Sequence, residues 1–109
     1  MKYSVHVVLD AETDLWDLYH YVAQSDSVEK ADRLIDNLNE TIKSLEAFSL
    51  RGHCPPELER VGIRDFKEIL FKPYRIIYQA AASDVFIYCI LDGRRQLTDI
   101  LQERLLRPE

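Results

Sequence analysis

Three short segments of strand-like composition follow one another in the second half of the chain, and they constrain its fold more than any other feature. Residues 64–71, 74–80 and 84–91 are rich in β-branched and aromatic side chains. Tight turns at residues 72–73 and 81–83 separate them, so consecutive strands have to run antiparallel. The sequence therefore predicts an antiparallel meander of three strands.

A first helix is predicted in residues 11–23, upstream of this meander. Asp10 stands where its carboxylate can cap the helix. Apolar residues at helical spacing are expected to face the core, whereas Asp14 and Asp17 are expected to point elsewhere. Trp16 is expected to pack in the core or against the neighbouring helix.

A second helix has the clearest pattern in the chain. Its apolar stripe has i, i+3, i+4, i+7 spacing and consists of Val28, Ala31, Leu34, Ile35, Leu38, Ile42 and Leu45. Asp26 followed by Glu29 fits a capping box at its start. Because only the short QSDS segment joins the two helices, they are expected to form an antiparallel hairpin.

Two further elements complete the expected order β-α-α-β-β-β-α. Residues 2–9 have the composition of a strand, which is expected to lie beside a later strand because an unpaired strand is costly. A terminal amphipathic helix is predicted from Leu97, Ile100, Leu101 and Leu105. The predicted fold is α+β, in one domain of 109 residues, with the helical hairpin packed on one face of a small, mainly antiparallel sheet. The other face is expected to be partly exposed and available to a partner or substrate.

The segment at residues 49–62 is predicted to be a loop, because the Pro55–Pro56 pair interrupts regular structure. Cys54 in this loop and Cys89 in the last predicted strand lack the spacing of metal ligands. Cys89 is expected to be a small buried apolar residue. No metal or organic cofactor is therefore expected.

The charge of −5 is divided unevenly along the chain. Residues 1–50 hold four Lys and Arg against ten Asp and Glu, whereas residues 51–109 hold ten against nine. This argues against nonspecific nucleic-acid binding, which needs a clear basic excess, but it allows a local basic patch. No apolar run is long enough for a membrane span, and the N-terminus lacks the pattern of a signal peptide. A cytoplasmic protein is expected.

Five segments of the chain, in order, resemble the RelE/ParE family of bacterial toxins. They are DLWDLYHYVA, ADRLIDNLNETIKSL, RGHCPPEL, PYRIIY and DGRRQL, and PYRIIY at residues 73–78 is the most specific of them. The resemblance extends over nearly the whole chain and implies the fold predicted above. It also implies the toxin of a type II toxin–antitoxin module, held in a hetero-oligomer by a cognate antitoxin that wraps around it.

The family divides into two branches that differ in their targets. RelE-like toxins cut mRNA on the ribosome, which needs a general base, a general acid and cations. They commonly have a histidine or tyrosine near the C-terminus, and this chain has neither after Tyr88. A nuclease would have to use Arg75, Arg94 and Arg95, with Lys72 as a further candidate cation, together with His53 or Tyr78. The ParE-like branch, which inhibits DNA gyrase and is not known for nuclease activity, is therefore favoured. The ribosome-dependent endoribonuclease is the alternative, and an inactive homologue that only binds an antitoxin is a second alternative.

The candidate contacts to a target or antitoxin are Tyr74, Arg75, Tyr78, Arg94 and Arg95. Arg75 is expected either to face the open sheet surface or to form a salt bridge with Glu68 or Asp65. The adjacent guanidiniums of Arg94 and Arg95 suit a clamp for a carboxylate or phosphate. Tyr74 and Tyr78 suit stacking on a base or, as the alternative, packing within the strand.

Overall fold

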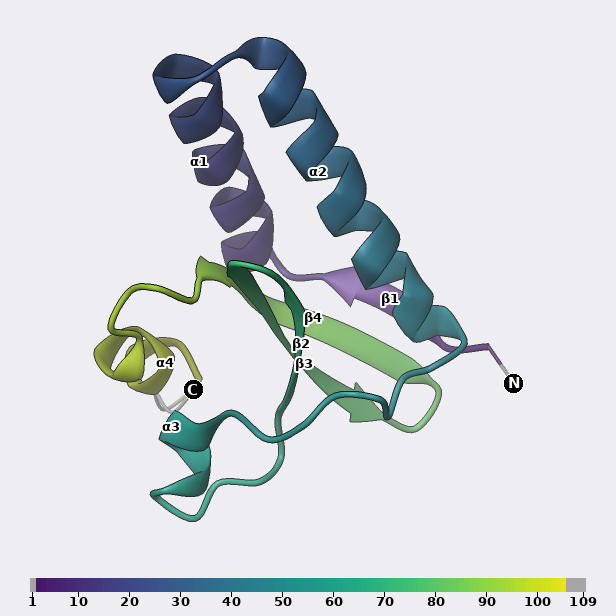
Figure 1. Cartoon of the computed structure of the whole chain (residues 1–109). Coiled ribbons are helices and arrows are strands. Elements are labelled where there is room, and N and C mark those ends of the chain that lie inside the picture. The colour runs from purple at the N-terminus through teal and green to yellow at the C-terminus, as the bar shows by residue number, and fades with distance from the viewer. Residues whose placement is uncertain (1, 106–109) are drawn as a thin grey trace.

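A four-stranded sheet with helices on both faces forms the centre of the computed structural model, which describes residues 2–105 (Figure 1). The elements in chain order are β1 (Ser4–Val7), α1 (Leu9–Ser25), α2 (Val28–Lys43), the 3-10 helix η1 (Ser44–Glu46), α3 (Pro56–Glu59), β2 (Lys67–Phe71), β3 (Tyr74–Ala81), β4 (Asp84–Asp92) and α4 (Thr98–Leu105). This arrangement confirms the predicted α+β fold.

The strands lie in the order β1-β4-β3-β2. β2, β3 and β4 form the predicted antiparallel meander, and β1 joins the sheet parallel to β4, with Ser4 opposite Asp84. The first strand of the meander is shorter than predicted: β2 begins at Lys67, and residues 64–66 lie before it. Phe66 is nevertheless buried, and this burial accounts for the strand-like composition of the segment.

A two-residue connection turns the chain from α1 into α2, and the two helices form the predicted hairpin (Figure 1). Both predicted caps are wrong. Val8 is the N-cap of α1, so Asp10 lies in the first helical turn. Ser27 caps α2 by accepting a hydrogen bond from the Lys30 N–H at 3.1 Å. The hydroxyl next to the first helical residue therefore takes the place that the capping box assigns to Asp26.

Side chains of the sheet alternate between two apolar clusters, one on each face. Ile76 and Tyr78 belong to the cluster under the α1–α2 hairpin. Ile77 belongs to the cluster that includes Leu58 of α3 and Leu101 of α4. The second face, expected to be partly exposed, is thus covered in part by α3 and α4.

The short helix α3 corrects the prediction that the proline pair interrupts regular structure. Pro56 is its first residue, where a missing N–H costs nothing and the fixed φ suits a helix. Leu58 of this helix is fully buried.

Cys89 is buried as predicted, and its burial raises the pKa of the thiol to about 11. Within residues 2–105, no helix combines the length and apolar character needed to cross a membrane.

Candidate functional site

Two hollows contain most of the residues selected from the sequence. The first, called here the Arg75 hollow, has a volume of about 430 Å³. Its lining includes His53, Glu57, Glu68, Lys72, Tyr74, Arg75 and Arg94. The second, called the α1–α4 trough, has a volume of about 840 Å³ and lies between α1, the end of β4 and α4. Arg95 lines the trough, whereas Tyr78 lines neither hollow.

Arg75 lies on β3 between two carboxylates. Its Nη1 and Nη2 donate to the two oxygens of Glu57 at 2.6 and 2.7 Å, and its Nε donates to Glu68 Oε1 at 2.6 Å. The Arg75 side chain is 12% exposed and that of Glu68 is 3% exposed. The predicted salt bridge between Arg75 and Glu68 is therefore present. The second carboxylate partner of Arg75 is Glu57, which the sequence analysis did not name, and not Asp65.

These bonds change the acid–base properties of the group. The hydrogen bonds to Glu57 raise the pKa of Arg75 further above its usual range, and the same bonds lower the pKa of Glu57. Both partners are thereby held in their charged forms at neutral pH. Freeing Arg75 for a ligand would leave two carboxylates without their cation, which is costly for partly buried groups.

His53 extends this group at the edge of the sheet. Its backbone pairs with that of Glu68 through two hydrogen bonds of 3.1 and 2.7 Å. Its imidazole Nε2 lies 3.0 Å from Glu68 Oε2, and the side chain is 61% exposed. The loop predicted in residues 49–62 therefore places an accessible imidazole against a buried carboxylate.

Gly52 explains how the loop approaches the sheet so closely. A Cβ at this position would lie 2.6 Å from the backbone oxygen of Glu68 and 2.8 Å from the hydroxyl of Tyr78. The Gly52 N–H donates to that hydroxyl at 3.1 Å. Tyr78 is otherwise fully buried, and burial raises its pKa. Of the two alternatives predicted for Tyr78, its buried position agrees with packing within the sheet. A contact between Tyr78 and a target stays a prediction.

Arg94 and Arg95 follow β4 at the turn into α4. The Arg94 guanidinium donates to both oxygens of Asp92, at 3.0 and 2.7 Å, and this lowers the pKa of Asp92. Gly93 brings the turn against the β2–β3 hairpin, where its N–H donates to the Pro73 oxygen at 2.7 Å. The two arginines are exposed but line different hollows, so they do not face one shared site.

Tyr74 is half-buried on β3 in the lining of the Arg75 hollow. Burial is the main cause of its raised pKa, and the Asp92 carboxylate contributes. Its phenol is thus neutral at physiological pH and suited to stacking or hydrogen bonding. A contact with a target or antitoxin stays a prediction here as well.

The sequence interpretation missed a buried ion pair between α1 and α4. Arg104 donates to the two oxygens of Asp14 at 2.6 and 2.7 Å, and Asp14 also accepts the Ile90 N–H at 2.9 Å. Asp14 is 6% exposed, so the prediction that it points elsewhere is wrong. A signal was available, because position 14 lies between Ala11 and Leu18 on the buried face of the helix.

Trp16 is 66% exposed, which contradicts its predicted packing in the core or hairpin. It lies on the face of α1 opposite the buried Ala11 and Asp14, and its ring meets that of His20 edge-on, with the ring centroids 4.5 Å apart. Aromatic character alone suggested burial, whereas the helical position of Trp16 indicates exposure.

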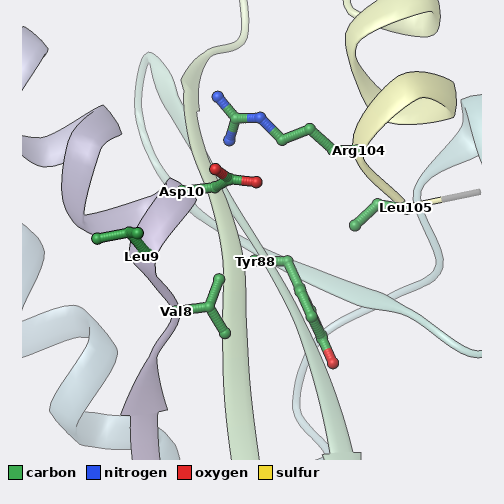
Figure 2. Close-up of a pocket in the computed structure, with 6 residues that line it drawn as sticks. All are labelled: Val8, Leu9, Asp10, Tyr88, Arg104 and Leu105. Atoms are coloured by element: carbon green, nitrogen blue, oxygen red, sulfur yellow. The ribbon is translucent and has the colours of Figure 1, made fainter. Parts of the chain in front are cut away.

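A smaller pocket of about 380 Å³ adjoins the trough, and the two share Asp10 and Arg104 in their linings. Figure 2 shows Asp10 from α1 and Arg104 from α4 directed toward one another across the β4 ribbon, with Tyr88 and Leu105 beside them. The pocket and the trough therefore form adjoining parts of one depression.

Across residues 2–105, no group of three or more His, Cys, Asp or Glu side chains is arranged to hold a metal ion.

Comparisons with known proteins agree with the family suggested by the sequence. Residues 6–97 match the family described as the ParE toxin of the type II toxin–antitoxin system parDE. Toxin ParE3 of Caulobacter vibrioides is 31% identical over 84 residues, which cover 77% of this chain and 80% of that protein. A solved structure titled as the chromosomal ParDE system from P. aeruginosa has the same fold. Its TM-score is 0.68 at 19% identity, over 82% of this chain and 94% of that one. The chain therefore belongs to the ParE toxin family of type II toxin–antitoxin systems.

Proposed function

We propose that this ParE-family toxin stops growth by inhibiting DNA gyrase, and that a cognate antitoxin neutralises it in a hetero-oligomer. Both events would take place in the cytoplasm. The family membership supports a protein target and a protein partner. The observation that carries the choice of target is that the Arg75 guanidinium is already bonded to two carboxylates.

An RNA-cleaving site needs a cation that can stabilise the charge developing on phosphate. In the Arg75 hollow, the guanidinium of Arg75 is already bonded to Glu57 and Glu68. Arg94 is likewise paired, with Asp92. The hollow therefore has the residue types of a nuclease, but its central guanidinium, that of Arg75, is not free to bind phosphate, and only the exposed Lys72 and Arg94 could supply cations there. This supports binding over RNA cleavage.

The exposed arginines fit a protein target better. Arg94 is 72% exposed even with its Asp92 partner, and Arg95 is exposed beside it. Neither needs a buried contact to be broken before it can bind a carboxylate on another protein. We assign Arg94 and Arg95, with Tyr74, to contacts with gyrase or the antitoxin.

One observation keeps the ribosome-dependent endoribonuclease as a second candidate. The structure brings His53, Lys72, Tyr74 and Arg94 to one hollow, although they are distant in the sequence. The imidazole of His53 is accessible, and its carboxylate partner could hold one tautomer. An activity test has to separate the two candidates.

The test follows labelled thymidine and labelled amino acid in one culture after the toxin is induced without an antitoxin. Gyrase inhibition predicts an early fall in thymidine incorporation while protein synthesis continues. An early fall in amino-acid incorporation would instead identify the nuclease, and normal growth would identify an inactive homologue. In vitro, the purified toxin is expected to block supercoiling of relaxed plasmid by gyrase and to leave ribosome-bound mRNA intact.

A further inference from the structure

We propose that Glu57 determines which ligands the Arg75 hollow excludes, because its carboxylate fills an anion site that would otherwise bind a phosphodiester of single-stranded nucleic acid. This inference rests on the proposed function and deepens it, since it assigns the preference for binding over RNA cleavage to one side chain. The two carboxylates that contact Arg75 hold different parts of its guanidinium, and this division carries the inference.

Glu68 is the inner partner of Arg75 and orients it. The Glu68 side chain is 3% exposed, and its Oε1 accepts the Arg75 Nε–H at 2.6 Å. Its Oε2 lies 3.2 Å from Arg75 Nη2 and 3.0 Å from His53 Nε2. Pairing with Ile77 on one side and with His53 on the other fixes the Glu68 backbone in the sheet. Glu68 therefore sets the direction of the guanidinium independently of the outer partner.

Glu57 is the outer partner and takes the terminal nitrogens. Arg75 Nη1 and Nη2 donate to its two oxygens at 2.6 and 2.7 Å, which is a bidentate geometry. The Glu57 side chain is 17% exposed, against 3% for Glu68. A phosphate group presents a similar pair of oxygens to the same pair of N–H groups. The Glu57 carboxylate thus occupies the position that a bound phosphate would take.

Neighbouring residues hold both the guanidinium and the Glu57 carboxylate in place. A Cβ at Gly93 would lie 3.0 Å from both Cγ and Cδ of Arg75, so the turn after β4 packs directly on the stem of this side chain. Glu57 stands in α3 next to Leu58, whose full burial anchors the helix. The guanidinium would therefore keep its orientation without Glu57, and the carboxylate is fixed against it.

The rest of the hollow suits a nucleotide. Lys72 and Arg94 line it and are exposed. Tyr74, half-buried in the same lining, offers a ring on which a base can stack. With His53 counted as neutral, three cations face two carboxylates in the lining, and loss of Glu57 would leave a single carboxylate against the three. The cations and the ring together match a phosphate with its adjacent base.

A phosphate cannot share this position with Glu57. The two anions would lie side by side, and such contacts between like charges are strongly unfavourable. Displacement of Glu57 would leave a mostly buried carboxylate without its cation. The wild-type hollow is therefore closed to nucleic acid, although Lys72 and Arg94 remain exposed in it.

The test measures binding of a short fluorescent single-stranded RNA to the full chain by fluorescence anisotropy. Glu57→Ala removes the carboxylate, and Glu57→Gln removes its charge while keeping its volume, in case the first variant does not fold. The matched control is Glu59→Ala, which changes the net charge equally at an exposed position of the same helix. A double variant with Glu57→Ala and Arg75→Gln shows whether any gain depends on Arg75. Thermal melts establish which variants are folded.

We expect Glu57→Ala to bind the RNA at least about tenfold more tightly than the wild-type chain. Glu57→Gln should gain less, because its amide oxygen still accepts from Arg75. Glu59→Ala should differ from wild type by less than about twofold, and the double variant should lose the gain. No gain in the folded Glu57 variants, an equal gain in the Glu59 control, or a gain that survives Arg75→Gln would overturn the inference.

Supercoiling assays with gyrase on the same samples separate this inference from the proposed target. If no sample inhibits gyrase while the RNA results hold, the proposed target fails and the role of Glu57 stands. If the wild-type chain inhibits gyrase while the folded Glu57 variants gain no RNA binding, the role of Glu57 fails and the target stands.

Discussion

The Asp14 carboxylate on α1 accepts two hydrogen bonds from the Arg104 guanidinium on α4, although ninety residues separate the two in the chain. The same carboxylate accepts the Ile90 N–H of β4. One buried acid thus connects the helical hairpin, the sheet and the C-terminal helix, and it also lines the α1–α4 trough.

Asp14→Ala is expected to lower the free energy of unfolding by about 3 kcal/mol, because it leaves Arg104 and the Ile90 N–H without their partner. Urea denaturation measures the change. Asp17→Ala, on the exposed side of the same helix, is the control and should cost less than about 0.5 kcal/mol. A double mutant that also carries Arg104→Ala should lose less than the sum of the single changes. Strict additivity would contradict the ion pair.

Arg94→Ala with Arg95→Ala is expected to reduce growth inhibition while the melting temperature stays within a few degrees of wild type. Exposed arginines contribute little to stability, even where Arg94 pairs with Asp92. Colony counts after induction and a thermal melt measure the two effects. Arg33→Ala with Arg60→Ala removes two exposed arginines elsewhere and should leave toxicity unchanged. Unaltered killing by the folded Arg94/Arg95 variant would exclude these residues as contacts.

Gly52→Ala is expected to destabilise the protein by about 2–4 kcal/mol, since the new methyl group would clash with the Glu68 backbone oxygen. Tyr78→Phe removes only the hydrogen bond to the Gly52 N–H and should cost about 1 kcal/mol. Thermal unfolding of both variants separates the steric effect from the loss of the hydrogen bond. Similar melting temperatures for the two would argue against the close approach of the loop.

Ala82→Gly is expected to stabilise the protein by about 1 kcal/mol, which corresponds to a rise in melting temperature of about 4–8 °C. Ala82 has φ of 55° in the two-residue turn between β3 and β4, a left-handed conformation that glycine adopts without strain. Ala81→Gly, one residue earlier in β3, is the matched control and should destabilise. A lower melting temperature for the Ala82 variant would contradict this turn geometry.

The Arg75–Glu57 pair predicts a specific loss of stability in acid. Because Arg75 lowers the pKa of Glu57 in the folded state, this pair stabilises the fold above the unfolded pKa of Glu57, near the usual ~4.3. The contribution is lost as the pH falls through the lower, folded pKa. Glu57→Gln should therefore reduce stability at neutral pH and flatten the acid limb of a stability–pH curve. Glu40→Gln, at an exposed position of α2, should leave the curve unchanged.

Local patterns predicted most of the fold. The strands of the meander and the stripe on α2 follow from composition and spacing within short segments. The placement of β1 beside a later strand follows from the cost of leaving a strand unpaired. The prediction failed at Pro56, where a proline that interrupts a helix interior is favourable at a helix start. It also failed at Trp16, because residue type was given more weight than helical position.

Partners distant in the sequence limited the prediction of the site. Glu68 was a foreseeable partner of Arg75, since the two lie on neighbouring strands. Glu57 was not foreseeable, because its place depends on a helix in a segment predicted to be a loop. The Asp14–Arg104 pair joins the two ends of the chain, where no local periodicity relates one residue to the other.

The backbone bridge between His53 and Glu68 also covers part of a sheet edge. β2 is an edge strand, and the free N–H and C=O groups of an edge can template the addition of a strand from another molecule. His53 occupies both backbone groups of Glu68, the second residue of that edge strand. At that residue, the chain itself takes the place that a foreign strand would need for pairing.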